Sequence, residues 1–599
     1  MWYRIEDLAI AARRIPTWIG SRVRHLWFEL SLRVRRRVAI GAGVVVVVAT
    51  FVLLAVPALP CQLPGGDRCP PADDAAALVP GDALLYVHVN TDPDTEQYER
   101  AAALAARLPS LTGQLVARLP GAAGAGIDYG RDVRPWLGGE AAVALVPATG
   151  KKIDQALLLE VGNEAGARRF ADQLTGKGTK SADYRDVAVT TRGGVSTAVV
   201  QGFLVVGTEL AVERVIDAGL GSRSLEDSGP AEEIDDELPD DSLVTAYVSE
   251  QGAEDLFRAG APLGGFEAFV NSDATLGAGA ALAVTGDGIE VDSHSLLDPE
   301  RLRNSPGFFE AFPPFEPNLA DELSSGALVY LGLGDPKDSI KALLAQATAE
   351  APGLVAGFED FSKQLEDEGK VNLQREVLPL LGGEAAIGIE PPPAQGDQGG
   401  GGEDEPEPPP GIEPGGPAPL PAEPGELSFA GVPYLGFVAD EVDEERARKA
   451  LADLQIPISE ALEPEEGGQA PVFEGEEIEG VQARSLRISP TVNLTYALFD
   501  DKLVVATDPA GVKQVKSGDD NLGDSDGFER ATDDLPGKPS ALLYLNVGDL
   551  IALAERQGLG ADPAYALFAS EIRKLEGLGL AVTRDESGIE TEARLTVEG

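Results

Sequence analysis

The feature of this sequence that most limits its fold is an internal repeat: several short segments recur in the same order later in the chain. Three pairs of segments align: ALLYVHV from Ala83 with ALVYLGL from Ala327, LGGEAAV from Leu137 with LGGEAAI from Leu381, and FLVVGT from Phe203 with KLVVAT from Lys502. The first two pairs share one offset of 244 positions, and the third has an offset of 299. Self-similarity of this kind indicates one structural unit that occurs twice. We therefore predict two homologous regions, residues 75–300 and 318–599.

An insertion in the second region explains most of the change in offset. Residues 391–425 contain 12 Pro and 9 Gly, with no aromatic and no basic residue. Such a segment cannot bury enough apolar surface to offset the entropy of ordering it. We predict a disordered, acidic loop there.

The hydrophobic spacing inside each region indicates strands and helices together. Leu84–Val89 and Ala198–Val206 are short apolar stretches typical of strands, whereas Leu104, Leu108 and Leu111 have helical spacing. Neighbouring strands are close in sequence, which favours antiparallel pairing. The expected fold is α+β, a duplicated ectodomain of mixed, mostly antiparallel sheets with packed helices, preceded by one transmembrane helix.

Residues 38–59 are the basis for the transmembrane prediction. This 22-residue segment has no charged residue, long enough for a helix to cross a bilayer. Four arginines precede it directly: Arg33, Arg35, Arg36 and Arg37. By the positive-inside rule they set the topology, with the N-terminus cytoplasmic and the C-terminal region outside the cell membrane. A cleaved signal peptide is the alternative, but its apolar core would be shorter and would begin earlier.

The charge of the chain divides at the same segment. Residues 1–37 carry nine Arg and three acids, about +6, so the formal charge of −51 leaves about −57 for the remainder. This basic tail either binds anionic lipid or only sets topology. The acidic remainder excludes a nucleic-acid partner, because phosphate binding needs clustered Lys and Arg.

Cysteine and histidine are too scarce for common metal or redox centres, and we predict no cofactor and no metal site. Cys61 and Cys69, the two cysteines, lie in the stalk predicted at residues 60–74. Outside the membrane they would form a disulfide; two free thiols are the alternative. His88 and His294 each stand on a strand without a nearby His or Cys, which is typical of core-edge or surface histidines.

Glu140 and Glu384 are the weak catalytic candidates. Each follows two glycines at the start of a strand, in both regions. They could serve in acid–base chemistry or bind a cation, but a turn glutamate that contacts backbone amides is the simpler interpretation. The acidic runs Glu232–Asp241 and Asp519–Glu529 lack the spacing of a calcium loop, and we interpret them as solvated.

Several segments resemble a known family. They are the run LVPGDALLYVHVN from Leu78, LGGEA from Leu137, YRDVA from Tyr184 and FLVVGT from Phe203. These runs are similar to those of an uncharacterised actinobacterial family of membrane-anchored proteins with a domain of unknown function. The resemblance implies a single-pass protein of the cell envelope and supplies no catalytic residue.

The function that these observations favour is a non-enzymatic, membrane-anchored protein of the bacterial cell envelope that binds or organises a partner outside the membrane. The bilayer would contact residues 38–59, and an envelope protein or a lipid would be the ligand. Three alternatives stay open: an envelope hydrolase that uses carboxylates, a lipid-binding or carrier ectodomain, and a transmembrane sensor.

Overall fold

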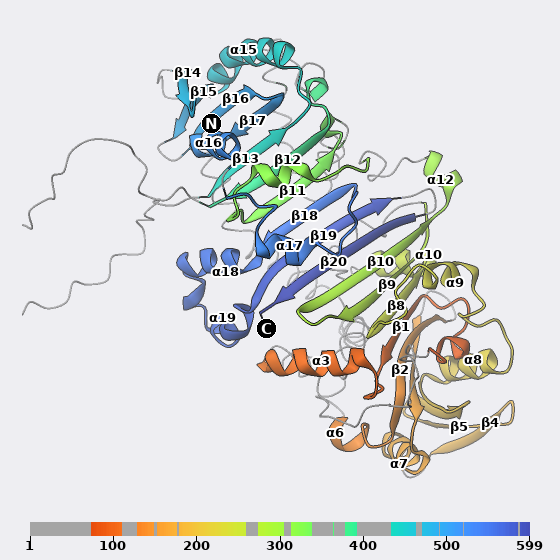
Figure 1. Cartoon of the computed structure of the whole chain (residues 1–599). Helices are drawn as coiled ribbons and strands as arrows, with labels where there is room; N and C mark the ends of the chain where they lie inside the picture. Colours follow the sequence, from red (N-terminus) through yellow and green to blue (C-terminus); the bar gives the residue numbers. More distant parts are fainter. Residues whose placement is uncertain are drawn as a thin grey trace, which may run out of the picture. The chain divides into compact units, whose positions relative to one another are not determined.

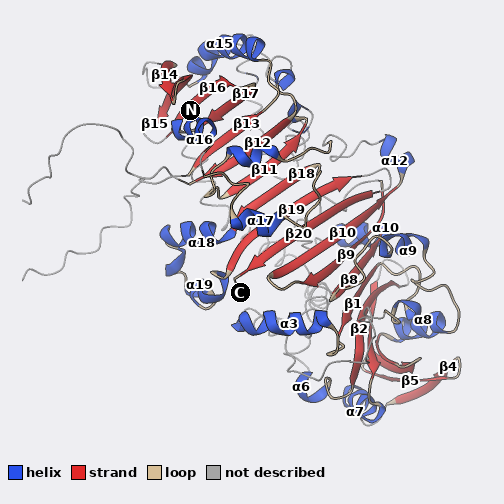
Figure 2. Ribbon diagram, viewed as in Figure 1, coloured by secondary structure: helices blue, strands red, loops and turns tan. Residues whose placement is uncertain are grey.

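The fold was analysed in a computed structural model. It describes residues 73–110, 129–148, 153–176, 179–258, 274–304, 313–337, 339, 363, 378–391, 433–462, 470–489, 492–518, 520–584 and 588–598. Helices and antiparallel strands alternate along the chain, which confirms the predicted α+β class (Figures 1 and 2). The chain forms two compact units. Unit 1 comprises Met1–Pro317, Leu331–Gly357 and Ser525–Gly599, and unit 2 comprises Asn318–Tyr330 and Phe358–Asp524.

The strands of unit 1 form one continuous antiparallel sheet in the order β4–β5–β6–β7–β3–β2–β1–β8–β9–β10–β20–β19–β18. Figure 1 shows its central strands side by side. Their bounds are β1 Leu85–Asn90, β2 Leu137–Pro147, β3 Ile153–Val161, β4 Lys180–Tyr184, β5 Val187–Arg192, β6 Val195–Val200, β7 Phe203–Gly207, β8 Val244–Ser249, β9 Thr275–Val284, β10 Gly288–Leu297, β18 Ala541–Asn546, β19 Leu575–Arg584 and β20 Gly588–Val597.

Helix α8 shows how a helix of unit 1 packs on this sheet. In α8, Val212, Val215 and Ile216 are fully buried at helical spacing and pack in one core cluster with Leu158 of β3. The helices are η1 Ala76–Leu78, α3 Glu96–Arg107, α6 Tyr129–Asp132, α7 Glu164–Thr175, α8 Glu209–Gly219, α9 Gly229–Asp235, α10 Glu250–Arg258, α12 Pro299–Asn304, α17 Asp526–Thr532, α18 Val547–Arg556, η6 Leu559–Ala561, α19 Pro563–Ala566 and α20 Ala569–Ile572; η marks a 3₁₀ helix.

Unit 2 contains a smaller antiparallel sheet in the order β14–β15–β16–β17–β13–β12. Its strands are β12 Glu384–Glu390, β13 Tyr434–Ala439, β14 Glu474–Ile478, β15 Val481–Ser489, β16 Val492–Phe499 and β17 Lys502–Ala506. Its helices are η3 Asn318–Glu322, η5 Leu378–Leu380, α15 Glu444–Ala461 and α16 Pro509–Ser517. Strand β11, Val329–Gly334, divides between the two units.

One predicted strand is two strands. Ala198–Val206 is interrupted after β6 by Gln201 and Gly202, whose φ angles are 45° and 92°. Positive φ at both central residues is typical of the two-residue turns that join hairpin strands. The closeness of Thr197–Gln201 and Phe203–Thr208 in the sequence indicates a strand pair here, and β6 pairs with β7 as that closeness predicts.

The membrane prediction requires correction. Among the described residues, no helix is long and apolar enough to cross a bilayer. The 18-residue helix α15, for example, contains seven charged residues in EERARKALADLQIPISEA. This finding contradicts the predicted single-pass architecture and the predicted location in the cell membrane. Several predicted features lie outside the described residues: the segment 38–59, the tail 1–37 with Arg33, Arg35, Arg36 and Arg37, the Cys61 and Cys69 pair, and 392–425 of the insertion.

Candidate functional site

A half-open cavity of about 420 Å³ lies over the middle of the unit 1 sheet. Its floor comes from β1 and β8, and its walls come from α9, from the residues before η1 and from the loop that leads to β8. The described residues that line it include six acids and no Lys or Arg. The acids, all of them exposed, are Asp73, Glu226, Glu232, Asp235, Asp236 and Asp240.

Strand alternation directs the floor residues into this cavity. Tyr86 and His88 are two positions apart on β1, so they lie on one face, and each is less than 5% exposed. Thr245 and Tyr247 of β8 pair directly with them. On the other side of β1, β2 places the small residues Ala142 and Ala144 opposite His88 and Tyr86.

Three potential ligand groups meet beside the cavity. One ligand atom from each of Asp73, His88 and Glu140 lies within 4.8 Å of the other two. His88 Nε2 is 3.7 Å from Glu140 Oε2, and both side chains are about 95% buried. Glu140 pairs with Asn90 on β1, so it lies diagonally across from His88 on the same face. The sequence predicted neither the cluster nor a metal site.

Glu140 also ties the start of η1 to the sheet. Its Oε2 accepts a hydrogen bond from the backbone N–H of Ala75 at 3.2 Å. Burial raises the pKa of Glu140 to about 7, partly countered by the Ala75 amide. The hydroxyl of Tyr86 donates to Asp73 Oδ1, and burial followed by the Asp73 charge raises the pKa of Tyr86 well above its usual value.

Glu384 makes the corresponding contacts in unit 2. It accepts hydrogen bonds from the N–H groups of Asn318 at 2.9 Å and Leu319 at 3.1 Å, at the start of η3. The hydroxyl of Tyr330 donates to it at 3.4 Å. Burial raises the pKa of Glu384 to about 8. We call Glu140 and Glu384 the capping glutamates, because each satisfies backbone donors of a 3₁₀ helix, as the simpler interpretation expected.

The glycines before the capping glutamates serve different purposes. Gly383 has a φ of +55°, which favours glycine. Gly138 lies inside β2 without a positive φ; a Cβ there would come within 2.5 Å of the Glu160 carboxylate. That carboxylate accepts from the N–H of Gly139. Of the four glycines before the capping glutamates, only Gly383 has a positive φ.

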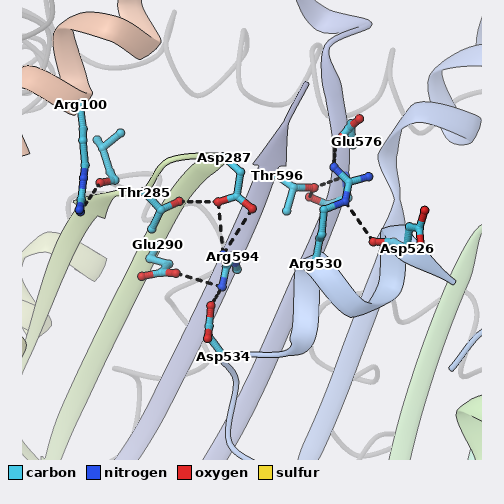
Figure 3. Close-up of polar contacts among 12 residues, drawn as sticks. Arg100, Thr285, Asp287, Glu290, Asp526, Arg530, Asp534, Glu576, Arg594 and Thr596 are labelled. Carbon is cyan, nitrogen blue, oxygen red and sulfur yellow. Dashed lines mark hydrogen bonds and ion pairs between the residues drawn. The ribbon is translucent and has the colours of Figure 1, made fainter. Parts of the chain in front are cut away.

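A second polar cluster lies where β10 pairs with β20 (Figure 3). Arg594 contacts Asp287 at 3.2 Å, Glu290 at 3.3 Å and Asp534. Two residues further along β10, on the same face of the sheet, Asp292 pairs directly with Glu592. Burial, then the Asp292 charge, raises the pKa of Glu592 to about 7. Two residues beyond Asp292, the Nδ1 atom of His294 lies 3.9 Å from Glu590 Oε1.

Two sequence signals at the cavity were missed. His88 was interpreted as a core-edge or surface histidine, whereas it is buried against Glu140. The acids of the run Glu232–Asp241 are exposed, as the solvated interpretation expected, but that interpretation missed that part of the run forms α9 and lines the cavity. Ile234 and Leu238, four residues apart among the acids, were the available sign of a face turned toward the sheet, and both pack in the core.

Comparison with solved structures shows only weak likeness. Crystal forms I, III and IV of TP0453 match with TM-scores of 0.24, 0.24 and 0.23, at 9%, 10% and 11% identity. Each match covers 38% of this chain and 79% or 81% of that chain. No curated protein matches the chain.

A family model covers most of the chain. It matches residues 38–404, a range that includes β1, β2 and both capping glutamates, and its description is a protein of unknown function. The match confirms the predicted resemblance to a domain of unknown function; it does not extend to an actinobacterial source or to membrane anchoring. The chain belongs to the family of proteins of unknown function DUF3352.

Proposed function

We propose that this protein is a non-enzymatic binding protein and that the cavity over β1 and β8 takes a small organic cation. The observation that carries the proposal is the lining: six exposed carboxylates and no Lys or Arg among the described residues around about 420 Å³. A volume of this size suits a small molecule. Negatively charged carboxylates around a concave site attract a positively charged ligand.

The buried floor supports the same ligand class. Tyr86 and Tyr247 present aromatic surface in the same cavity, and an aromatic face attracts a cation held over it. A lipid chain suits the cavity less well, because a hydrocarbon gains nothing from six carboxylates and would desolvate those it covered. This argues for an amine over the lipid ligand considered from the sequence.

We further propose that the protein contains two copies of one unit and that the cavity belongs to the first copy. Asn318, Leu319 and Tyr330 stand 244 positions after Asp74, Ala75 and Tyr86, and the capping glutamates differ by the same 244. Glu384 accepts a hydrogen bond from Leu319 as Glu140 accepts one from Ala75.

Three residue pairs between β10 and β20 also support the duplication. Asp292 pairs with Glu592, the residue 300 positions later. On one side Glu290 pairs with Arg594, and on the other His294 pairs with Glu590. Adding 300 to the β10 position of one flanking pair gives the β20 position of the other.

A hydrolase is the second candidate. The observation that favours it is Glu140, whose pKa is raised to about 7 at 3.7 Å from His88 Nε2, the range for a general acid or base. A screen of the purified protein against ester, amide and glycoside substrates tests it. Turnover that is unchanged by Glu140→Gln and by Glu384→Gln would remove both glutamates as catalytic residues.

Calorimetric titration with putrescine, spermidine and choline tests the binding proposal, with acetate as the anionic control. We expect saturable binding of at least one cation, weakened about tenfold or more by the double variant D235N/D240N, since two charges leave the lining. The matched control D526N/E529Q removes two exposed charges from α17 and should change affinity less than about twofold. Equal binding of acetate, or no effect of D235N/D240N, would overturn the proposal.

A further inference from the structure

We infer that Asp73, His88 and Glu140 bind a divalent transition-metal ion at the inner wall of the cavity. The inference goes beyond the proposed function, because it places a metal ion, and not an organic cation, beside the same cavity. It is carried by the convergence of three ligand atoms within 4.8 Å of one another on separate elements: the segment before η1, strand β1 and strand β2.

The donor set defines the class of metal. One imidazole nitrogen with two carboxylates suits Zn²⁺, Mn²⁺, Fe²⁺ or Co²⁺, whereas Mg²⁺ and Ca²⁺ prefer oxygen donors alone. Three protein ligands leave at least one coordination position for water or another molecule. Asp73 and His88 line the cavity, so such a position would face space that a small molecule can enter.

The two carboxylates are already oriented by neighbouring donors. The Tyr86 hydroxyl and the N–H of Ala76 donate to Asp73 Oδ1, the latter at 3.2 Å. The N–H of Ala75 donates to Glu140 Oε2. Outer hydrogen bonds of this kind fix the direction of metal ligands and lower the cost of assembling them. These hydrogen bonds hold both carboxylates beside His88, so that the three donors need only close in from separations within 4.8 Å to bind one ion.

The second region separates this site from the capping role. Residues 244 positions after Asp73 and His88 are Pro317 and Gly332, neither of which offers a ligand. Glu384 nevertheless accepts backbone hydrogen bonds at η3 as Glu140 does at η1. The capping contact therefore requires neither an aspartate nor a histidine at these positions. Their presence beside the cavity is a separate property of the first region, and metal binding accounts for it.

Calorimetric titration of the full chain with Zn²⁺ tests the inference, in a C61S/C69S background that removes thiol ligands. We expect one ion per chain. Both H88A and D73N should lower the affinity about 100-fold or more, because each removes one of three ligands. H294A, which removes a buried histidine from β10, is the matched control and should change it less than about twofold. Co²⁺ should give a visible absorption band that H88A abolishes.

The outcomes are separable. Zn²⁺ binding that survives H88A and D73N, or no stoichiometric binding, overturns the inference. If the organic cations bind while Zn²⁺ does not, the metal site is wrong and the proposed function stands; if neither binds, both are wrong. Circular dichroism checks that the variants fold. Asp73 is exposed and its replacement by Asn is nearly isosteric, so D73N keeps the test valid if H88A disturbs β1.

Discussion

The two capping glutamates have the same task in different surroundings. Glu140 lies near the start of β2 and Glu384 is the first residue of β12; both are at most 5% exposed and accept hydrogen bonds from the backbone where a 3₁₀ helix begins. Beside Glu140 stand His88 and an acid-lined cavity. Beside Glu384 stands Tyr330, whose hydroxyl donates to it directly. The shared contacts therefore belong to the fold, and the contacts found only near Glu140 belong to the proposed binding site.

This comparison makes stability and binding independently testable. A change that removes a capping contact should lower stability wherever it is made. A change to His88 or Asp73 should alter binding while most of the stability persists. Among these contacts, the one at Glu384 holds the most donors.

Glu384→Ala should produce the largest loss of stability. It leaves the N–H groups of Asn318 and Leu319 and the Tyr330 hydroxyl without their acceptor, and each buried group left unsatisfied costs about 1–3 kcal/mol. We expect a loss of about 3 kcal/mol in the free energy of unfolding, measured by urea denaturation. Glu460→Ala, at an exposed position of α15, is the control and should cost less than about 0.5 kcal/mol.

Glu140→Ala should cost less, about 2 kcal/mol, because the Tyr86 hydroxyl donates to Asp73 and keeps its acceptor. Urea denaturation of both alanine variants under one set of conditions gives the comparison. A larger loss for Glu140→Ala than for Glu384→Ala would show that the first site depends on its glutamate for more than capping.

Glu384 should also make stability depend on pH in a definite direction. Its pKa rises from 4.5 to about 8 on folding, so the folded state holds a proton that the unfolded state releases. The resulting stabilisation is complete below pH 4.5 and is lost as pH rises through 8. Glu384→Gln cannot titrate. We expect it to be more stable than the unmodified protein by about 1–2 kcal/mol at pH 9 and about equal at pH 5, measured by urea denaturation at both values.

A pH profile of Glu384→Gln parallel to that of the unmodified protein would contradict this prediction. It would mean that the carboxylate is ionised in the folded protein at neutral pH, and that the amides of Asn318 and Leu319 outweigh the cost of burial.

The sequence predicted the elements better than the site. Hydrophobic periodicity is local, so the strand at Leu85–Asn90 was predicted, as Leu84–Val89, within one residue of each bound. The cavity depends on residues far apart in the chain: Asp73 and Asp235 meet only because η1 and α9 pack on the same sheet. No spacing rule joins such positions. Glu140 was located because the second region repeats its motif, whereas His88 was set aside because nothing there matches it.

The smallest expected effect concerns the pair on which the proposed duplication centres. Asp292 lies directly opposite Glu592, and like charges facing each other across two strands are destabilising. Burial, and then Asp292, Glu590 and Glu290, raises the pKa of Glu592 from 4.5 to about 7. Stability from the protonated carboxyl is therefore complete below pH 4.5 and is lost as pH rises through 7.

Glu592→Gln should raise the free energy of unfolding at pH 8 by about 1 kcal/mol or less, after allowance for solvent screening, and leave it unchanged at pH 4. The exposed control E598Q should have no effect at either pH. If Glu592→Gln instead destabilises the protein at pH 8, contacts of the ionised Glu592 outweigh its repulsion by Asp292. The charged residues that pair between β10 and β20 would then stabilise the sheet as an ion-pair network.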